Sequence, residues 1–140
     1  MPFQEKSAWI MLLALLLSGI PYISNIVTLS HGAQLPPPNI QQLVYYTIIL
    51  ILIAVIGHII ITAFSAKDAN AKLDERERRI FDRAGKLAGY VFGFGSVGSL
   101  IFYLFFADGN LLFYGVLGSL IIGQLVEYIT KIYFYRWNIL

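Results

Sequence analysis

The stretch Lys67 to Lys86, KDANAKLDERERRIFDRAGK, decides the fold because it is the only long charged segment of the chain. It holds seven of the ten basic residues and five of the eight acidic residues. The sequence on each side of it contains two apolar runs of about 20 residues, the length of a helix that crosses a bilayer. The segment therefore separates two hydrophobic hairpins.

The composition excludes several classes of protein. Of the 140 residues, 58% are hydrophobic and 13% are charged, whereas soluble domains have about 25% charged residues. The chain has no cysteine, which excludes disulfide bonds, thiolate zinc sites and cysteine nucleophiles. Basic and acidic residues are interleaved and the net charge is only +2, so no nucleic-acid partner is expected. We expect a single all-α integral membrane domain over residues 1–140, with the lipid bilayer as its surroundings.

Four transmembrane helices, paired as two antiparallel hairpins, are expected near residues 8–29, 43–64, 87–106 and 111–132. A signal peptide is the competing interpretation of the first run, because a basic residue precedes it. The run is long for a signal peptide and no Ala-x-Ala site follows it, which favours a retained helix. Pro21 is expected to kink that helix.

The loop between the first two runs contains Pro36, Pro37 and Pro38, which cannot form a helix interior. Such a run can bind aromatic-lined grooves, but a rigid extended loop is favoured here. Asn39 follows and is expected to cap the second helix, with Gln42 as its capping-box partner.

The charged segment itself is predicted to form a helix over residues 72–86. Asp74 and Glu77 have the spacing of a capping box, which predicts a helix start near Leu73. Several acidic residues of the segment precede a basic residue by four positions. Each such pair stabilises a helix by about a few tenths of a kcal/mol. We expect this amphipathic helix to continue into the third span without a break.

Basic residues predict the orientation in the membrane. The loops after the first and third spans, which contain His31 and Asp108, have no Lys or Arg. The charged segment has seven, and Lys6, Lys131 and Arg136 mark the two chain ends. We expect the protein to lie in the inner (plasma) membrane of the cell. The positive-inside rule then predicts that both termini and the charged segment lie in the cytoplasm.

The segment DERERRIFDRAG at residues 74–85 resembles a family of small four-helix bacterial and archaeal membrane proteins of unknown function. Their shared feature is an Asp-Glu-Arg-Glu run between two hydrophobic hairpins, followed by an Ile and a basic-Ala pair. The matching residues are Asp74, Glu75, Arg76, Glu77, Ile80, Arg83 and Ala84. The resemblance implies a four-helix membrane protein and supplies no activity and no functional residues.

The third and fourth spans are rich in small residues. Residues 93–98 match the dinucleotide fingerprint G-x-G-x-x-G, which is rejected because that motif follows a strand and opens a water-exposed helix. Helix packing is the better interpretation, since small residues let membrane helices approach closely. The candidate packing residues are Gly85, Gly89 and Gly93 on the third span, and Gly115, Ser119 and Gly123 on the fourth. These faces meet either within one protomer or across a homodimer.

His58 and Glu127 are the ionisable residues inside apolar spans, at similar depth, and Tyr90 and Gln124 lie near them. Polar groups at such depth suggest a functional site. In the structural alternative, Glu127 pairs with Lys131 and His58 bonds to a backbone carbonyl. A proton or ion site is the next alternative. A metal or haem site is the weakest, because haem ligation would need the histidine of two protomers. No metal and no cofactor are expected.

Two functions fit these features. The first is a non-enzymatic membrane protein that acts through helix contacts, as an accessory or regulatory subunit of a larger complex or as a homo-oligomer. The second is a small oligomeric transporter or channel for protons, ions or small molecules that uses His58 and Glu127. Small multidrug exporters carry their carboxylate in the first helix, which has none within its apolar run here. No catalytic residue set is visible, so an enzyme is not expected.

Overall fold

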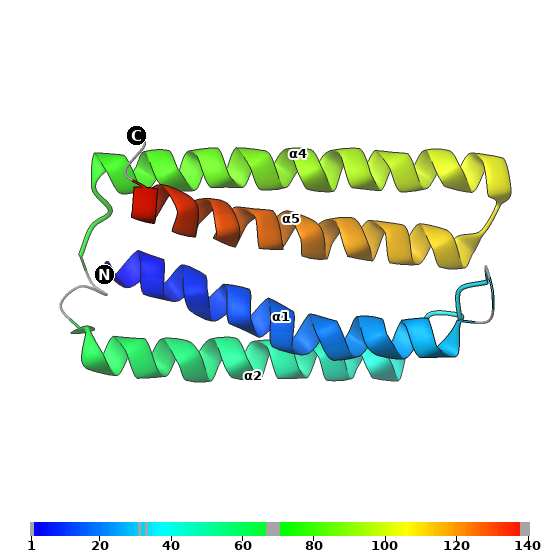
Figure 1. The fold of residues 1–140 in the computed structure, drawn as a ribbon, viewed down its shortest axis with the longest axis horizontal. Coiled ribbons are helices and arrows are strands. Elements are labelled where there is room, and N and C mark those ends of the chain that lie inside the picture. Colours follow the sequence, from blue (N-terminus) through cyan, green and yellow to red (C-terminus); the bar gives the residue numbers. More distant parts are fainter. Residues whose placement is uncertain (1, 31, 33, 67–70, 138–140) are drawn as a thin grey trace.

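The computed structural model describes residues 2–30, 32, 34–66 and 71–137. Four long helices make up most of this part of the chain (Figure 1): α1 Phe3–Leu29, α2 Ile40–Phe64, α4 Glu75–Phe106 and α5 Gly109–Trp137. The all-α class is therefore confirmed. His31, which the sequence places in the first loop, and the last three residues of the aromatic tail lie outside the described residues.

The helices form two antiparallel hairpins that lie side by side (Figure 1). α1 packs against α2, α4 packs against α5, and contacts between α1 and α5 join the hairpins. The start of α1 and the end of α5 lie at the same end of the bundle as the start of α4, and we call this the termini end. At the opposite, loop end, the Asn110 side chain donates a hydrogen bond to the Leu35 carbonyl at 3.1 Å. This bond ties the two hairpin loops together.

All four helices are long and apolar enough to cross a membrane. The shortest, α2, has 25 residues, which corresponds to about 37 Å of helix against a hydrocarbon core of about 30 Å. Each helix includes the span expected from the sequence and extends beyond it at one or both ends. The structure is therefore compatible with a multi-pass membrane protein.

The distribution of side chains differs from that in a soluble protein. Large apolar residues are exposed along every helix, and α2, the most apolar, buries none of its residues. The buried residues include small or polar ones such as Ala14, Ser18 and Ser119 beside larger apolar ones such as Ile80 and Ile121. Between membrane helices there is no hydrophobic driving force, and close packing of small residues takes its place. This arrangement fits a chain surrounded by lipid.

The predicted capping box at the start of α4 is confirmed. The Asp74 carboxylate accepts a hydrogen bond from the Glu77 backbone N–H at 2.6 Å, and the Glu77 carboxylate accepts one from the Asp74 N–H at 3.2 Å. The helix begins at Glu75, three residues later than the expected residue 72, and continues without a break to Phe106. The charged segment and the third span are thus one helix of 32 residues.

Polar caps also set the starts of α2 and α5, whereas Pro2 before α1 makes no side-chain cap bond. The Asp108 carboxylate accepts from the backbone N–H groups of Asn110 and Leu111 and so opens α5 after a tight turn. Asn39 caps α2 as expected, but its side chain accepts from the N–H of Gln41. The predicted capping box with Gln42 is wrong, because one amide bond two residues ahead already satisfies the cap.

Candidate functional site

The small residues of α5 pack against α4 as the sequence predicts. A Cβ atom on Gly123 would lie 3.1 Å from the carbonyl oxygen of Ala88. Gly115 faces the side chain of Ser99, and the Ser119 side chain occupies the space beside Gly95. These positions leave no room for a larger side chain, so they set the close approach of α4 and α5.

Of the two alternatives for Gly85, Gly89 and Gly93, close contact within one protomer is not observed, and contact across a homodimer stays a prediction. A Cβ atom on Gly85, Gly89 or Gly93 would meet nothing within 4 Å, so these glycines do not contact another helix of the chain at that position. Alanines one residue earlier in the helix, Ala84 and Ala88, are buried in their place. Because successive helical residues are rotated by about 100°, this shift of one residue places the glycines at the edge of the α4–α5 contact and not within it.

A groove of about 210 Å³ lies beside the open glycine face. Gly85 and Gly89 of α4 line it together with Gln124 and Glu127 of α5. Gly123 of α5 lines the groove as well, so two of the predicted polar candidates share a site with three of the predicted packing glycines. Tyr90, by contrast, is 63% exposed and does not line the groove.

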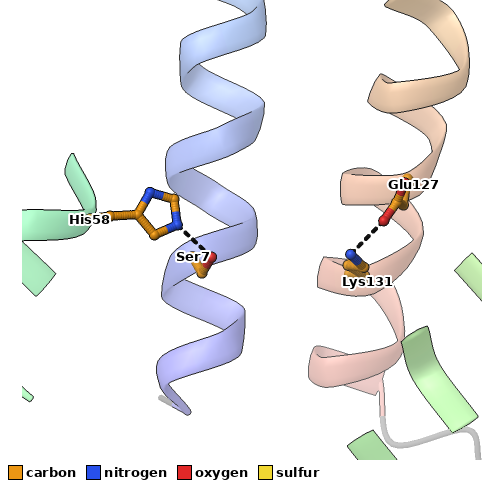
Figure 2. A network of polar contacts seen from close by, with 4 residues as sticks. All are labelled: Ser7, His58, Glu127 and Lys131. Carbon is orange, nitrogen blue, oxygen red and sulfur yellow. Dashed lines mark hydrogen bonds and ion pairs between the residues drawn. The ribbon is translucent and has the colours of Figure 1, made fainter. Parts of the chain in front are cut away.

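His58 of α2 is held by two hydrogen bonds. Its Nδ1 lies 2.7 Å from the carbonyl oxygen of Ala54, one turn earlier in the same helix. Its Nε2 lies 2.8 Å from the Ser7 hydroxyl of α1 (Figure 2). A carbonyl oxygen only accepts hydrogen bonds, so Nδ1 carries the proton of the neutral ring and Nε2 accepts from Ser7. The predicted bond to a backbone carbonyl is observed.

Glu127 pairs with Lys131 one turn later in α5, as the structural alternative predicts. The carboxylate and the ammonium group are 2.6 Å apart (Figure 2). The Lys131 ammonium group also lies 4.2 Å from the centre of the Phe81 ring and 5.1 Å from that of Tyr128. Lys131 is only 6% exposed. The ion pair and the ring faces together compensate for burial of this charge.

His58 and Glu127 do not meet. Figure 2 shows the imidazole on one side of α1 and the carboxylate of α5 on the other. Each residue has its own hydrogen-bond partner, Ser7 for the histidine and Lys131 for the carboxylate. The pair that motivated a proton or ion pathway is therefore not formed.

A second cavity, also of about 210 Å³, lies at the termini end and receives side chains from all four helices. Ser7 of α1, His58 of α2, Phe81 of α4 and Lys131 of α5 line it. Sequence reasoning did not include Ser7 or Lys131 among the site residues, because their role depends on contacts between helices. The available signals were the four-residue spacing of Glu127 and Lys131, and the position of Ser7 and Lys131 near the same end of their helices as His58.

Further polar contacts fasten the termini end. The Glu5 carboxylate is buried and accepts a hydrogen bond from Arg136 at 3.2 Å, which joins the two ends of the chain. The Arg136 guanidinium also lies over the Trp9 ring at 5.6 Å. Tyr135 donates to the Glu77 carboxylate at 3.3 Å. The start of α4 is thus held to the end of α5.

Metal chemistry finds no support in the described ranges, which contain no group of three His, Cys, Asp or Glu side chains able to hold a metal ion. No protein-family model, curated protein or solved structure matches the chain. The resemblance carried by residues 74–85 therefore stays a prediction, and function has to be argued from the sites themselves.

Proposed function

We propose that this chain is a small multi-pass protein of a bacterial inner membrane that acts through helix–helix contacts, as an accessory or regulatory subunit or as a homo-oligomer. The observation that carries the proposal is the open glycine face of α4. Gly85, Gly89 and Gly93 recur every four residues and meet no atom of a neighbouring helix at their Cβ positions. No catalytic role is assigned to any residue.

The energetic argument is that this face is costly without a partner. Each glycine in a helix interior is less favourable than alanine by about 1 kcal/mol. On α5 the corresponding cost at Gly115 and Gly123 is offset by close packing on α4. On α4 no helix of this chain offsets it, whereas a helix of a second protein would, because repeated small residues allow two membrane helices to touch.

The groove beside the glycine face supplies polar groups for the same contact. Gln124 and Glu127 line it next to Gly85 and Gly89. In a membrane, amide and carboxylate groups stabilise helix association by accepting hydrogen bonds across the interface. A partner helix that lies along α4 therefore has both a close-packing surface and hydrogen-bonding groups available.

The orientation that we propose places the termini end in the cytoplasm. Three charged segments lie at this end: the start of α4, the start of α1 with Lys6, and the end of α5 with Arg136. Cytoplasmic membrane surfaces favour such basic clusters. The alternative transporter or channel function is not favoured, since His58 and Glu127 bind separate partners.

The test is the oligomeric state of glycine variants in lipid nanodiscs and mild detergent. Gly89→Leu and Gly93→Leu are each expected to weaken the association of the protein with a second copy, or with a co-purifying membrane partner, at least about tenfold. Loss of close backbone contact is the reason. The thermal midpoint of the isolated chain is not expected to fall. Light scattering of the purified protein and fluorescence energy transfer between labelled chains measure association directly.

Gly98→Leu is the matched control. Gly98 lies on the same helix and its Cβ would also meet nothing within 4 Å, but it is off the face formed by Gly89 and Gly93. It is expected to associate like the parent. A parent chain that neither self-associates nor retains a partner, or an equal effect of all three substitutions, contradicts the proposal.

A further inference from the structure

The cavity at the termini end is polar and has no carboxylate in its lining. The hydrogen-bonding groups that line it are the Gln4 amide, the Ser7 and Tyr128 hydroxyls, the His58 imidazole and the Lys131 ammonium. Because the only fully charged group among these is a cation, the cavity suits an anion and is unsuited to a metal ion, which needs oxygen or nitrogen ligands free of a competing ammonium.

Lys131 brings a cation to the lining of this cavity. Its partner Glu127 lines the other groove, beside the glycines of α4. The ammonium has three N–H donors, and its hydrogen bond to Glu127 uses one of them. Beyond that bond, the ammonium has two further donors to offer an anion.

Ser7 adds a hydroxyl group whose hydrogen-bond partner depends on the protonation state of His58. With a neutral ring, Ser7 donates its proton to Nε2. With a protonated ring, Nε2–H donates to the Ser7 oxygen, and the hydroxyl proton is then free to point into the cavity. Nδ1 stays bonded to the Ala54 carbonyl in both states, so the ring keeps its position while the hydroxyl changes its partner.

We propose that this cavity binds a phosphate group, with Lys131 and Ser7 as its principal donors. The space of about 210 Å³ accommodates a tetrahedral oxyanion together with water. Ser7 lies about 6 Å along α1 from its first residue, and Lys131 about 9 Å along α5 from its last. That depth is where the hydrocarbon core gives way to headgroups. The phosphate comes from a lipid headgroup or from a soluble phosphate, since both present the same chemistry.

The experiment is calorimetric titration of the purified full-length protein in a neutral detergent. One arm uses inorganic phosphate against chloride at equal ionic strength, and the other uses a short-chain phosphatidic acid against the corresponding diacylglycerol. Binding is expected in at least one arm. Saturation by phosphatidic acid alone identifies a headgroup site, and saturation by inorganic phosphate identifies a site open to soluble phosphate.

Two variants test the donors. Ser7→Ala leaves the Glu127–Lys131 ion pair intact and is expected to weaken phosphate binding about tenfold, as loss of one hydrogen bond to a charged group does. Lys131→Gln is expected to abolish it, with Lys131→Arg restoring part. Ser24→Ala, an exposed serine of the same helix, is expected to bind like the parent. The absence of binding in both arms, or parent-like affinity in Ser7→Ala, overturns the proposal.

Discussion

His58 and Glu127 occupy similar depths near the termini end, yet α1 lies between their side chains (Figure 2). The imidazole bonds to Ser7 at 2.8 Å, and the carboxylate bonds to Lys131 at 2.6 Å. Each polar group is thus satisfied by a neighbour that does not involve the other. The two residues form separate units, one joining α1 to α2 and one within α5.

The first prediction concerns the independence of these units. The thermal destabilisation caused by His58→Leu and by Glu127→Gln should add in the double variant to within about 0.5 kcal/mol, as changes without a shared partner do. Thermal unfolding in one defined detergent measures all four members of the cycle. A coupling energy well above that margin would show that the two side chains interact in the membrane.

A second cycle, between Glu127 and Lys131, is the positive control. Removing either partner leaves a poorly hydrated charge, at a cost of about 1–3 kcal/mol, and removing both relieves it. Glu127→Gln combined with Lys131→Met should therefore be less destabilising than the sum of the two single changes. Additive effects in this cycle would mean that the ion pair does not stabilise the folded chain.

Several features were predictable from sequence because they depend on residues close together in the chain. The capping box of Asp74 and Glu77 uses groups three residues apart. The hairpins follow from apolar runs separated by a charged segment and a tight turn at Asp108. Glu127 and Lys131 are one helical turn apart in α5. Local geometry alone fixes each of these contacts.

Contacts between distant residues were harder to predict. The sequence favours glycine as the marker of close packing, but alanine is small enough to serve, and Ala84 and Ala88 take the interface while Gly85 and Gly89 stay open. Helix rotation is set by the best fit of the whole face, which no single residue reveals. The partner of His58 is likewise decided by the pairing of α1 with α2.

The close approach of α5 to α4 leads to the next prediction. Gly123→Val should destabilise the chain by about 1–3 kcal/mol, because the new side chain would press on the Ala88 carbonyl oxygen. Gly118→Val is the control, since a Cβ on Gly118 meets nothing within 4 Å. The measurement is the thermal midpoint in detergent. Equal midpoints for the two variants would contradict the packing described for α4 and α5.

Orientation is tested by labelling single cysteines in intact cells. Cysteine at Gln34, exposed at the loop end, should react with an impermeant thiol reagent, and cysteine at Lys72, exposed before α4, should react only after the membrane is opened. These positions are preferred to Asp108 and Arg136, whose side chains hold α5 and Glu5. The reverse labelling would place the termini end outside the cell.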